Sequence, residues 1–305
     1  MSGFTKFKKY KRYANERFPL RVYGIYTASL YFVSYLFGNT LAATPDTDFT
    51  NMVPGFAVIF LFFIQLRIFD EHKDFESDCI EHPDRMLSKG EITLKELRTV
   101  MYAVIALEVA INLFLGVIQL ALWGIIFLWS LLMLKEFFCP DFLKKKPTLY
   151  IFSHQMVIPM ICLYALSGRI ELYSLGRYSV VLMLVFMSAC ICLTMSMEHA
   201  RKIRLVPIGK EMSAFTPGRS NRLAGFSVSM LLAVFGWAVL MITSISGNTG
   251  AVLNIAGAIL FAFYVLKGAV LYRNPEPVKI KEFKSFSMIF VFGIFILSGI
   301  NFYFV

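Results

Sequence analysis

Three aspartates at helical spacing are the feature of the sequence that most clearly suggests chemistry. Asp70, Asp74 and Asp78 recur every four residues after an apolar run, so on a continuing helix their carboxylates form one stripe. Like charges at this spacing repel each other, and a cation would offset the repulsion. Mg²⁺ prefers carboxylate oxygens and keeps water or substrate phosphate as its other ligands. The stripe and the adjacent Glu71 therefore predict a magnesium site, although a solvated acidic helix end partly neutralised by Lys73 is a simpler alternative.

A second charged group lies at the end of a later apolar run. Glu198 is followed by Arg201 and Lys202, and Arg204 comes two residues further on. We interpret Glu198 as a carboxylate for a second metal and the three cations as a clamp for an anionic leaving group. Because Arg201 and Lys202 lie three and four residues after Glu198, ion pairing along one helix explains their spacing equally well.

Two further cations belong to the first charged segment. Lys73 lies within the aspartate stripe, and Arg85 follows the helix-ending pair at residues 82–83, His-Pro. Together with Arg204, we expect them to bind phosphate oxygens, although Arg85 is explained equally well as a charge that orients the chain in a membrane. Gly90 suits a turn before the next apolar run.

These charged segments must be positioned by a membrane-spanning framework. The chain has 305 residues, of which 57% are hydrophobic, and its mean hydropathy is +0.65. A run of about 20 apolar residues, at 1.5 Å per residue, is long enough to cross the ~30 Å hydrocarbon layer. We predict an all-α, multi-pass membrane protein whose nine spans are 20–40, 52–69, 97–116, 118–138, 149–168, 176–197, 223–244, 250–272 and 285–305.

The basic residues test this division independently. If the N-terminus is cytoplasmic, 28 of the 30 Lys and Arg residues fall on the cytoplasmic side, and only Arg169 and Arg177 fall opposite. Cytoplasmic loops are generally enriched in Lys and Arg. The net charge of +10 therefore indicates membrane topology and not nucleic-acid binding. We predict one domain, 1–305, with a basic cytoplasmic tail at 1–19, an external C-terminus and both charged segments on the cytoplasmic face, most simply in the plasma membrane of a prokaryote.

Other residues are expected to be structural. The basic, aromatic tail lacks the pattern of a cleaved signal peptide and could dock on anionic lipid. Glu108 should face the interior of the bundle, where Asn112 can hydrogen-bond to it, and His154 and Gln155 open the fifth span. Packing is the favoured role for these four, although orienting an acceptor remains open. We also expect no disulfide or metal site among the five cysteines, Cys79, Cys139, Cys162, Cys190 and Cys192.

Taken together, the charged segments suit a ligand with a diphosphate head and an apolar tail. The head needs Mg²⁺ and cationic side chains, and the tail needs a groove within the bilayer. The 31 Phe and 14 Tyr residues could supply the lining of such a groove.

The layout resembles the UbiA superfamily of intramembrane prenyltransferases. That family has nine helices and two acidic motifs, after the second and sixth helices, and its first motif commonly reads Asn-Asp-x-x-Asp-x-x-x-Asp. This chain has Asp70-Glu71-x-x-Asp74-x-x-x-Asp78, followed by Pro83-x-Arg85 and Gly90-x-Ile92, with Met86 where Pro is more usual.

The second motif departs from the family pattern of two or more aspartates. The chain offers Glu198, then Arg201-Lys202-x-Arg204, and a distant Glu211. A divergent branch of the superfamily has similar Glu-x-x-Arg-Lys patterns, and the stretch from Glu136-Phe137-Phe138-Cys139-Pro140 to Ser153-His154 also resembles that branch.

The resemblance implies an Mg²⁺-dependent transfer of an isoprenoid chain from a prenyl diphosphate to a lipophilic, aromatic acceptor in the bilayer. A terpene cyclase of the same superfamily is the first alternative, and a non-enzymatic transporter is the second. The implied metal ligands are Asp70, Glu71, Asp74, Asp78 and Glu198. The implied diphosphate-binding cations are Lys73, Arg85, Arg201, Lys202 and Arg204.

Overall fold

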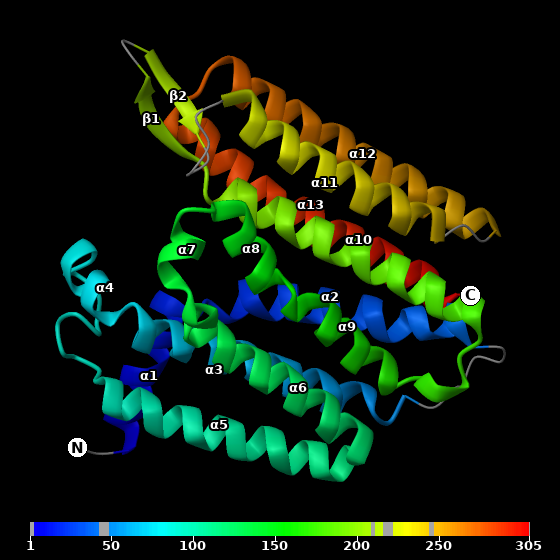
Figure 1. Cartoon of the computed structure of the whole chain (residues 1–305), viewed down its shortest axis with the longest axis horizontal. Coiled ribbons are helices and arrows are strands. Elements are labelled where there is room, and N and C mark those ends of the chain that lie inside the picture. Colours follow the sequence, from blue (N-terminus) through cyan, green and yellow to red (C-terminus); the bar gives the residue numbers. More distant parts are fainter. Residues whose placement is uncertain (1–2, 43–48, 209–210, 216–221, 244–246, 305) are drawn as a thin grey trace.

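The computed structural model of the chain describes residues 3–42, 49–208, 211–215, 222–243 and 247–304. Nearly all of its elements are helices (Figure 1). The first half contains α1 (Gly3–Arg17), α2 (Leu20–Leu41), α3 (Met52–Lys73), α4 (Phe75–Glu81), α5 (Leu94–Leu115), α6 (Val117–Leu134), η1 (Glu136–Phe138) and α7 (Pro140–Lys144). The second half contains α8 (Pro147–Gln155), α9 (Val157–Ser167), η2 (Leu172–Ser174), α10 (Arg177–Arg201), β1 (Arg204–Ile208), β2 (Glu211–Phe215), α11 (Arg222–Thr243), α12 (Gly247–Arg273) and α13 (Pro277–Tyr303).

Seven helices in the described part of the chain are long and apolar enough to cross a membrane. They are Met52–Lys73, Leu94–Leu115, Val117–Leu134, Thr148–Ser167, Arg177–Arg201, Gly250–Arg273 and Pro277–Tyr303. The two other predicted spans correspond to α2 and α11, which form helices of 22 residues each. The all-α, multi-pass prediction is confirmed, while the number of nine spans stays a prediction.

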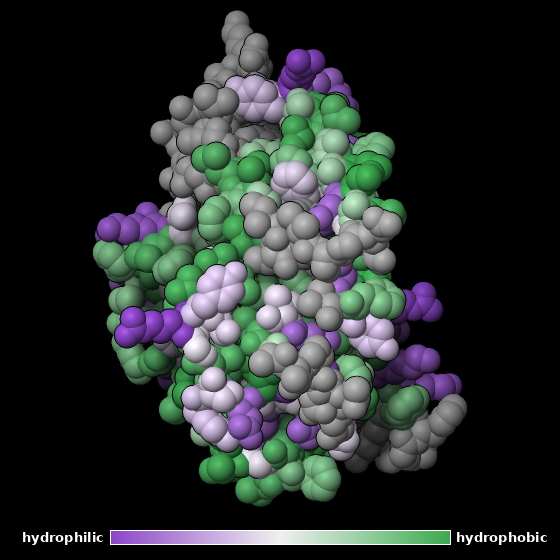
Figure 2. Space-filling view, turned by 90° about the vertical axis from the view of Figure 1, so that its right-hand side faces the viewer, coloured by the Kyte–Doolittle hydropathy of each residue, from purple (hydrophilic) through white to green (hydrophobic). Residues whose placement is uncertain are grey.

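The two ends of the helix bundle differ in character. Figure 1 shows α1, α4, α7 and the β1–β2 hairpin at one end of the long axis, with the labelled C-terminus at the other. Termini at opposite ends agree with an odd number of crossings. Figure 2 looks at the end where the C-terminus lies and shows a broad hydrophobic area with hydrophilic residues in separate small groups.

Helix α2 lies at the centre of the packing. It contacts α3, α9, α10 and α13, and it buries the large side chains of Tyr31, Tyr35 and Phe37. The Phe37 ring stacks on Phe186 of α10 with centroids 4.1 Å apart. Other large apolar side chains, such as Phe114 near the end of α5, point outward, as expected for a surface that faces lipid.

The fifth predicted span, 149–168, is divided in the structure. Helix α8 ends at Gln155 and α9 begins at Val157, with Met156 between them. Pro159 explains the break, because its nitrogen has no hydrogen to donate and its ring conflicts with the carbonyl of Gln155, four residues earlier.

The segment 198–222, expected to be a loop, contains an antiparallel β-hairpin. Its two strands are the β-strands found among the described residues. Arg204 pairs with Phe215 at its open end, and Ile208 pairs with Glu211 next to the turn. The β-branched residues Val206 and Ile208 in the segment Arg204–Ile208 favour an extended strand.

The end of α6 carries an unusual backbone. The fourth predicted span reaches 138, but α6 ends at Leu134, and Glu136, Phe137 and Phe138 have φ of 46°, 52° and 57°. Three consecutive non-glycine residues with positive φ are strained, at roughly 1–2 kcal/mol each. The turn brings Phe137 to the His154 ring, with centroids 5.8 Å apart. Strain of this kind is typical of segments that position functional side chains.

Candidate active site

A cavity of about 280 Å³ joins the two charged segments. Arg67 and Asp70 of α3 line it together with Glu198 and Arg201 of α10. These residues lie more than 120 positions apart in the sequence and meet because α3 and α10 end at the same end of the bundle. Residues of both charged segments therefore line one pocket, although Asp74 and Asp78 are not among its lining residues.

The remainder of the cavity is largely aromatic and apolar. Tyr23 and Tyr26 enter from α2, Phe63 from α3, and Phe292 from α13. The Tyr26 ring lies 5.4 Å from the Phe63 ring and 5.5 Å from the Phe292 ring. The cavity therefore combines charged side chains with an aromatic and apolar lining. This combination suits a ligand with an anionic head and an apolar tail.

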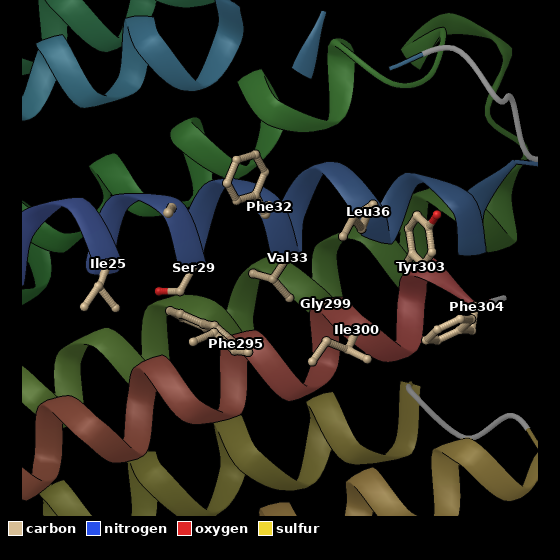
Figure 3. Close-up of a pocket in the computed structure, with 12 residues that line it drawn as sticks. Ile25, Ser29, Phe32, Val33, Leu36, Phe295, Gly299, Ile300, Tyr303 and Phe304 are labelled. Atoms are coloured by element: carbon tan, nitrogen blue, oxygen red, sulfur yellow. The ribbon is translucent and has the colours of Figure 1, made fainter. Parts of the chain in front are cut away.

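A second, larger groove lies between α2 and α13 and contains none of the charged residues of the cavity. Its volume is about 550 Å³, and Figure 3 shows Ile25, Ser29 and Val33 of α2 facing Phe295 and Ile300 of α13 across it. Its walls are almost entirely apolar. Tyr26 and Phe292, which line the cavity and are in ring contact, lie one and three residues from Ile25 and Phe295, which line the groove.

Asp70 has its nearest cation on its own helix. Arg67 Nη1 lies 3.7 Å from Asp70 Oδ2, in an i,i+3 pair. Lys73, expected to neutralise the stripe in part, lowers the pKa of Asp74 by its charge. Its ammonium donates to the Tyr150 hydroxyl at 3.3 Å and lies 3.8 Å from a Glu136 oxygen. The i,i+3 spacing would allow Lys73 to form an ion pair with Asp70. Lys73 instead hydrogen-bonds to Tyr150 of α8, which is more buried than Asp70.

Asp74 lies where the aspartate stripe bends. It is the C-cap of α3 and the N-cap of α4, with φ −98° and ψ 8°, so the continuous helix predicted through 78 is interrupted here. Backbone bonds from Asp74 N to Asp70 O and from Asp78 N to Asp74 O, each 2.8 Å, preserve the four-residue spacing. Burial raises the pKa of Asp74; Lys73 lowers it, and the nearby carboxylates Asp78 and Glu136 raise it again. A cation bound there would favour the ionised form.

Glu71 and Asp78 already have arginine partners. Glu71, whose side chain is 1% exposed, accepts from Arg17 Nε at 2.6 Å and from Arg67 Nη2 at 2.8 Å. Asp78 accepts from Arg17 Nη2 at 3.0 Å and from Arg85 Nη1. The two carboxylates are therefore tied to guanidinium groups, and Arg85, predicted to bind phosphate, lies on Asp78.

Two lysines meet one aromatic ring beside the cavity. Lys202 Nζ lies 4.6 Å from the centroid of the Tyr150 ring, and Lys73 Nζ lies 5.9 Å from it. Burial lowers the pKa of Lys202; the Glu198 carboxylate opposes this shift, and the cations Arg201 and Lys73 add to it. An anion placed between the two ammonium groups would relieve their repulsion.

Glu198 pairs locally. Arg201 donates to Glu198 Oε2 through Nη2 at 2.9 Å and through Nε at 3.2 Å, three residues apart on α10. The Arg201 side chain is 65% exposed, so it can turn to another partner at small cost. Arg204 is the first residue of β1, and its side chain lies outside those that the structure describes.

The acidic groups fit a magnesium ion that takes part of its coordination from the substrate. Among the described residues, no group of three or more His, Cys, Asp or Glu side chains is assembled that could hold a metal ion by itself. Mg²⁺ is commonly bound through one or two carboxylates plus waters and substrate phosphates. Asp70 and Glu198, which line the same cavity, would supply the two carboxylates.

Several contributors were missed or undervalued in the sequence. Arg17 lies in the N-terminal segment, which the sequence identified only as a basic tail. It is too far from residues 71–78 in the sequence for helical spacing to link them. Arg67 could have been found, because it lies three and four residues before Asp70 and Glu71. His154 and Gln155 also line the cavity, and His154 Nε2 and Gln155 Oε1 are buried without a hydrogen-bond partner among the described residues.

The intramembrane polar group behaves as predicted. Glu108 is fully buried, and its Oε2 accepts from Trp123 Nε1 at 3.0 Å. Asn112 donates to the Glu108 backbone carbonyl at 2.8 Å and accepts from the Tyr164 hydroxyl at 2.8 Å. These bonds join α5, α6 and α9, away from the cavity. All five cysteines, expected to be unpaired, are free.

Comparison with known proteins agrees with this geometry. A model of the UbiA prenyltransferase family matches residues 31–296. Among solved structures, one of digeranylgeranylglyceryl phosphate synthase has a TM-score of 0.62 at 18% identity, covering 98% of this chain and 100% of that one. The apo structure of a UbiA homologue from Aeropyrum pernix K1 has a TM-score of 0.57 at 13% identity, covering 90% and 96% of the two chains.

A comparison with curated proteins finds no match. The structural likenesses, at these identities, establish the fold, and the family model covers most of the sequence. With its apolar helices and its cavity that joins two charged segments, the chain is an integral membrane protein that belongs to the UbiA prenyltransferase family.

Proposed function

We propose that the protein transfers an isoprenoid chain from a prenyl diphosphate to an apolar, aromatic acceptor within the membrane, with Mg²⁺ as its cofactor. One observation carries the proposal: a single cavity has Asp70, Glu198 and Arg201 at its charged end and aromatic side chains below. Membership of a prenyltransferase family supports the same reaction class.

The residues at the charged end have separate proposed tasks. Asp70, Asp74 and Glu198 would hold the metal, and Mg²⁺ when bound supplies electrostatic stabilisation of the leaving diphosphate. Glu71 and Asp78 complete the predicted acidic set, although direct ligation would require them to leave their arginines. The predicted diphosphate clamp consists of Lys73, Arg85, Arg201, Lys202 and Arg204.

The clamp acts by binding the head and stabilising its growing charge. As the bond between the allylic carbon and the diphosphate oxygen breaks, the electron pair leaves with the oxygen. Arg201, whose side chain is exposed, would turn toward that oxygen. Lys73 and Lys202, which lie over the Tyr150 ring, would also stabilise its charge. The acceptor then forms a bond to the allylic carbon and loses a proton.

The apolar tail is proposed to lie along α2 and α13. In this proposal the tail passes Tyr26 and Phe292, cavity residues that are one and three positions from the groove residues Ile25 and Phe295. Displacing these rings would join the two spaces. The surrounding lipid and aromatic side chains would then exclude water from the allylic cation, which water would otherwise capture.

A panel of labelled geranyl, farnesyl and geranylgeranyl diphosphates, incubated with the purified protein in lipid nanodiscs, tests the function. We expect diphosphate release that requires Mg²⁺ and ceases in EDTA. Turnover undiminished in EDTA would contradict the metal role. No turnover with any donor, combined with donor movement across a sealed liposome membrane, would favour the transporter alternative.

Product analysis distinguishes transfer from cyclisation. Mass spectrometry after incubation without an added acceptor should find only hydrolysed alcohol if the enzyme is a transferase. A cyclic hydrocarbon or cyclic alcohol would identify a terpene cyclase of the same family.

Filling the groove provides a sharper test of the tail's path. Ala28→Phe places a ring in the groove, whereas Gly24→Phe, on the same helix, extends into open space. We expect Ala28→Phe to lower kcat/KM for the longest accepted donor by about tenfold relative to the shortest, the scale of a few blocked methylene contacts. An equal effect on all donors would place the tail elsewhere.

The orientation in the membrane is a further part of the proposal. The site would face the cytoplasm, in the plasma membrane of a prokaryote, because 28 of the 30 Lys and Arg residues are assigned to the side that holds the charged segments. Labelling of single cysteines introduced at 84 and 177 from each side of sealed vesicles would test it. Reaction of position 84 from the external side would contradict it.

A further inference from the structure

The N-terminal helix is fastened across the first acidic segment. Tyr13 of α1 is buried in a small hydrophobic cluster with Ile68, Met86, Leu87 and Ile92. Glu16 Oε1 accepts from the Met86 backbone N–H at 3.2 Å. Figure 1 shows α1 at the same end of the bundle as α4. Helix α1 is thus part of the folded site end and more than a lipid-facing tail.

The cations of α1 differ in how deeply they are engaged. Arg12 pairs with Glu91 at 2.8 Å, but its side chain is exposed. Lys9 binds Glu96 at 2.6 Å near the start of α5. Arg17, at the end of α1, is only 12% exposed and reaches into the acidic segment.

Arg17 spans the break between α3 and α4. Its Nε donates to Glu71 on α3 at 2.6 Å, and its Nη2 donates to Asp78 on α4 at 3.0 Å. Asp74, the residue at the break, lies between these two partners in the sequence and joins the two helices. One planar guanidinium therefore connects both sides of the bend, which a lysine ammonium of compact charge does less well.

The bend leaves few other contacts to hold α4. It has seven residues, none of them fully buried, and Phe75 at its start packs against the Tyr13 cluster. Further along α4, the ion pairs of Asp78 with Arg17 and Arg85 hold it in place. Arg85 precedes Met86 and Leu87, which are buried in the same cluster as Tyr13, so both arginines tie α4 to the bundle. Arg17 differs in that it also donates to Glu71 on α3. Arg17 is the partner able to fix α4 relative to α3.

We propose that Arg17 is a positioning residue of the metal–diphosphate site, which fixes the direction of the Asp74 carboxylate by clamping α3 and α4 on either side of it. The inference rests on the proposed function, because Asp74 is there taken to bind the metal. It also assigns Glu71 and Asp78 a supporting part, as the two anchors of the clamp. Positioning groups behind metal ligands typically contribute 10–100-fold to metal affinity.

Arg17→Ala and Arg17→Lys, compared with Arg12→Ala, test the clamp. The first readout needs no metal: hydrogen–deuterium exchange at residues 75–81 of metal-free protein should accelerate in Arg17→Ala and stay unchanged in Arg12→Ala. The second is the Mg²⁺ concentration that gives half-maximal binding of geranylgeranyl S-thiolodiphosphate, a slowly reacting donor analogue. We expect a rise of about tenfold or more in Arg17→Ala and a smaller rise in Arg17→Lys.

Each outcome supports or overturns the inference. A shift in both readouts for Arg17→Ala, with Arg12→Ala like the unsubstituted protein, supports it. Faster exchange without a change in Mg²⁺ demand overturns it and leaves Arg17 a purely structural residue, as does an equal effect of Arg12→Ala. If Arg17→Ala does not fold, Arg17→Lys carries the test with the same criteria. Failure of the unsubstituted protein to bind the analogue would instead contradict the proposed function, and exchange at α4 would still decide whether the clamp exists.

Discussion

The two acidic segments of the cavity are held in opposite ways. Glu71 and Asp78 in the first segment are tied to arginines from three parts of the chain, and Glu71 is almost fully buried. Among the described side chains, Glu198 in the second segment pairs with Arg201, which lies on the same helix and is largely exposed. Buried, multiply bonded carboxylates are costly to disturb, whereas an exposed i,i+3 pair exchanges partners readily. The first segment is thus a fixed frame and the second an adaptable clamp.

Removing the charge of Glu71 should have the largest effect. Glu71→Gln leaves the guanidinium groups of Arg17 and Arg67 facing each other without their shared carboxylate. Breaking one partner from a buried ion pair costs about 3–5 kcal/mol, and we expect the lower end here because the arginines are partly exposed. Unfolding in mixed micelles measures it. Glu91→Gln, which affects only the exposed pair with Arg12, is the control. Equal stability of the two variants would show that the frame is not held by these bonds.

Neutralising the carboxylates of the aspartate stripe should have the next largest effect, on turnover. Asp70→Asn and Asp74→Asn should each lower the rate at least ~100-fold, the scale for losing one group that stabilises charge in a transition state. The exposed Asp84→Asn is a control on the same loop. Diphosphate release at saturating Mg²⁺ is the measurement.

The substitution Asp78→Asn tests whether Asp78 binds metal or only pairs with its arginines. A loss as large as that of Asp70→Asn, with unchanged exchange at α4, would mean that Asp78 leaves its arginines to bind metal. A smaller loss with faster exchange would place it in the frame.

The features predictable from the sequence are those with local causes. The four-residue spacing of Asp70, Asp74 and Asp78 survives in the structure, and the i,i+3 spacing of Glu198 and Arg201 correctly anticipated their ion pair. The apolar runs likewise gave the membrane helices, because length and composition suffice to define them.

The features missed depend on contacts between distant segments or on backbone exceptions. Arg17 meets Glu71 across 54 positions, and nothing in the tail's own pattern marks it out from its basic neighbours. The left-handed turn at 136–138 contains no glycine, the usual signal for positive φ. The break before α9 could have been found, since Pro159 lies inside a predicted span.

Removing the charge of Glu198 should have the smallest effect on stability and the most informative one on function. Its only described ion pair is exposed on the Arg201 side, so Glu198→Gln should change the free energy of unfolding by less than ~1 kcal/mol. If Glu198 binds metal, the same substitution should raise the Mg²⁺ concentration needed for half-maximal rate.

Arg201→Ala separates the two roles of the adaptable clamp. It removes a cation from the cavity while leaving Glu198 in place, so it should weaken donor binding and change the Mg²⁺ requirement little. If Glu198→Gln leaves both the Mg²⁺ requirement and the rate unaltered, the first segment is the whole metal site and Glu198 serves only to hold Arg201. In that case Glu198→Gln and Arg201→Ala should both weaken donor binding, since a freed Arg201 side chain loses the orientation that two hydrogen bonds to Oε2 give it. Steady-state rates across a Mg²⁺ titration, at two donor concentrations, distinguish these outcomes.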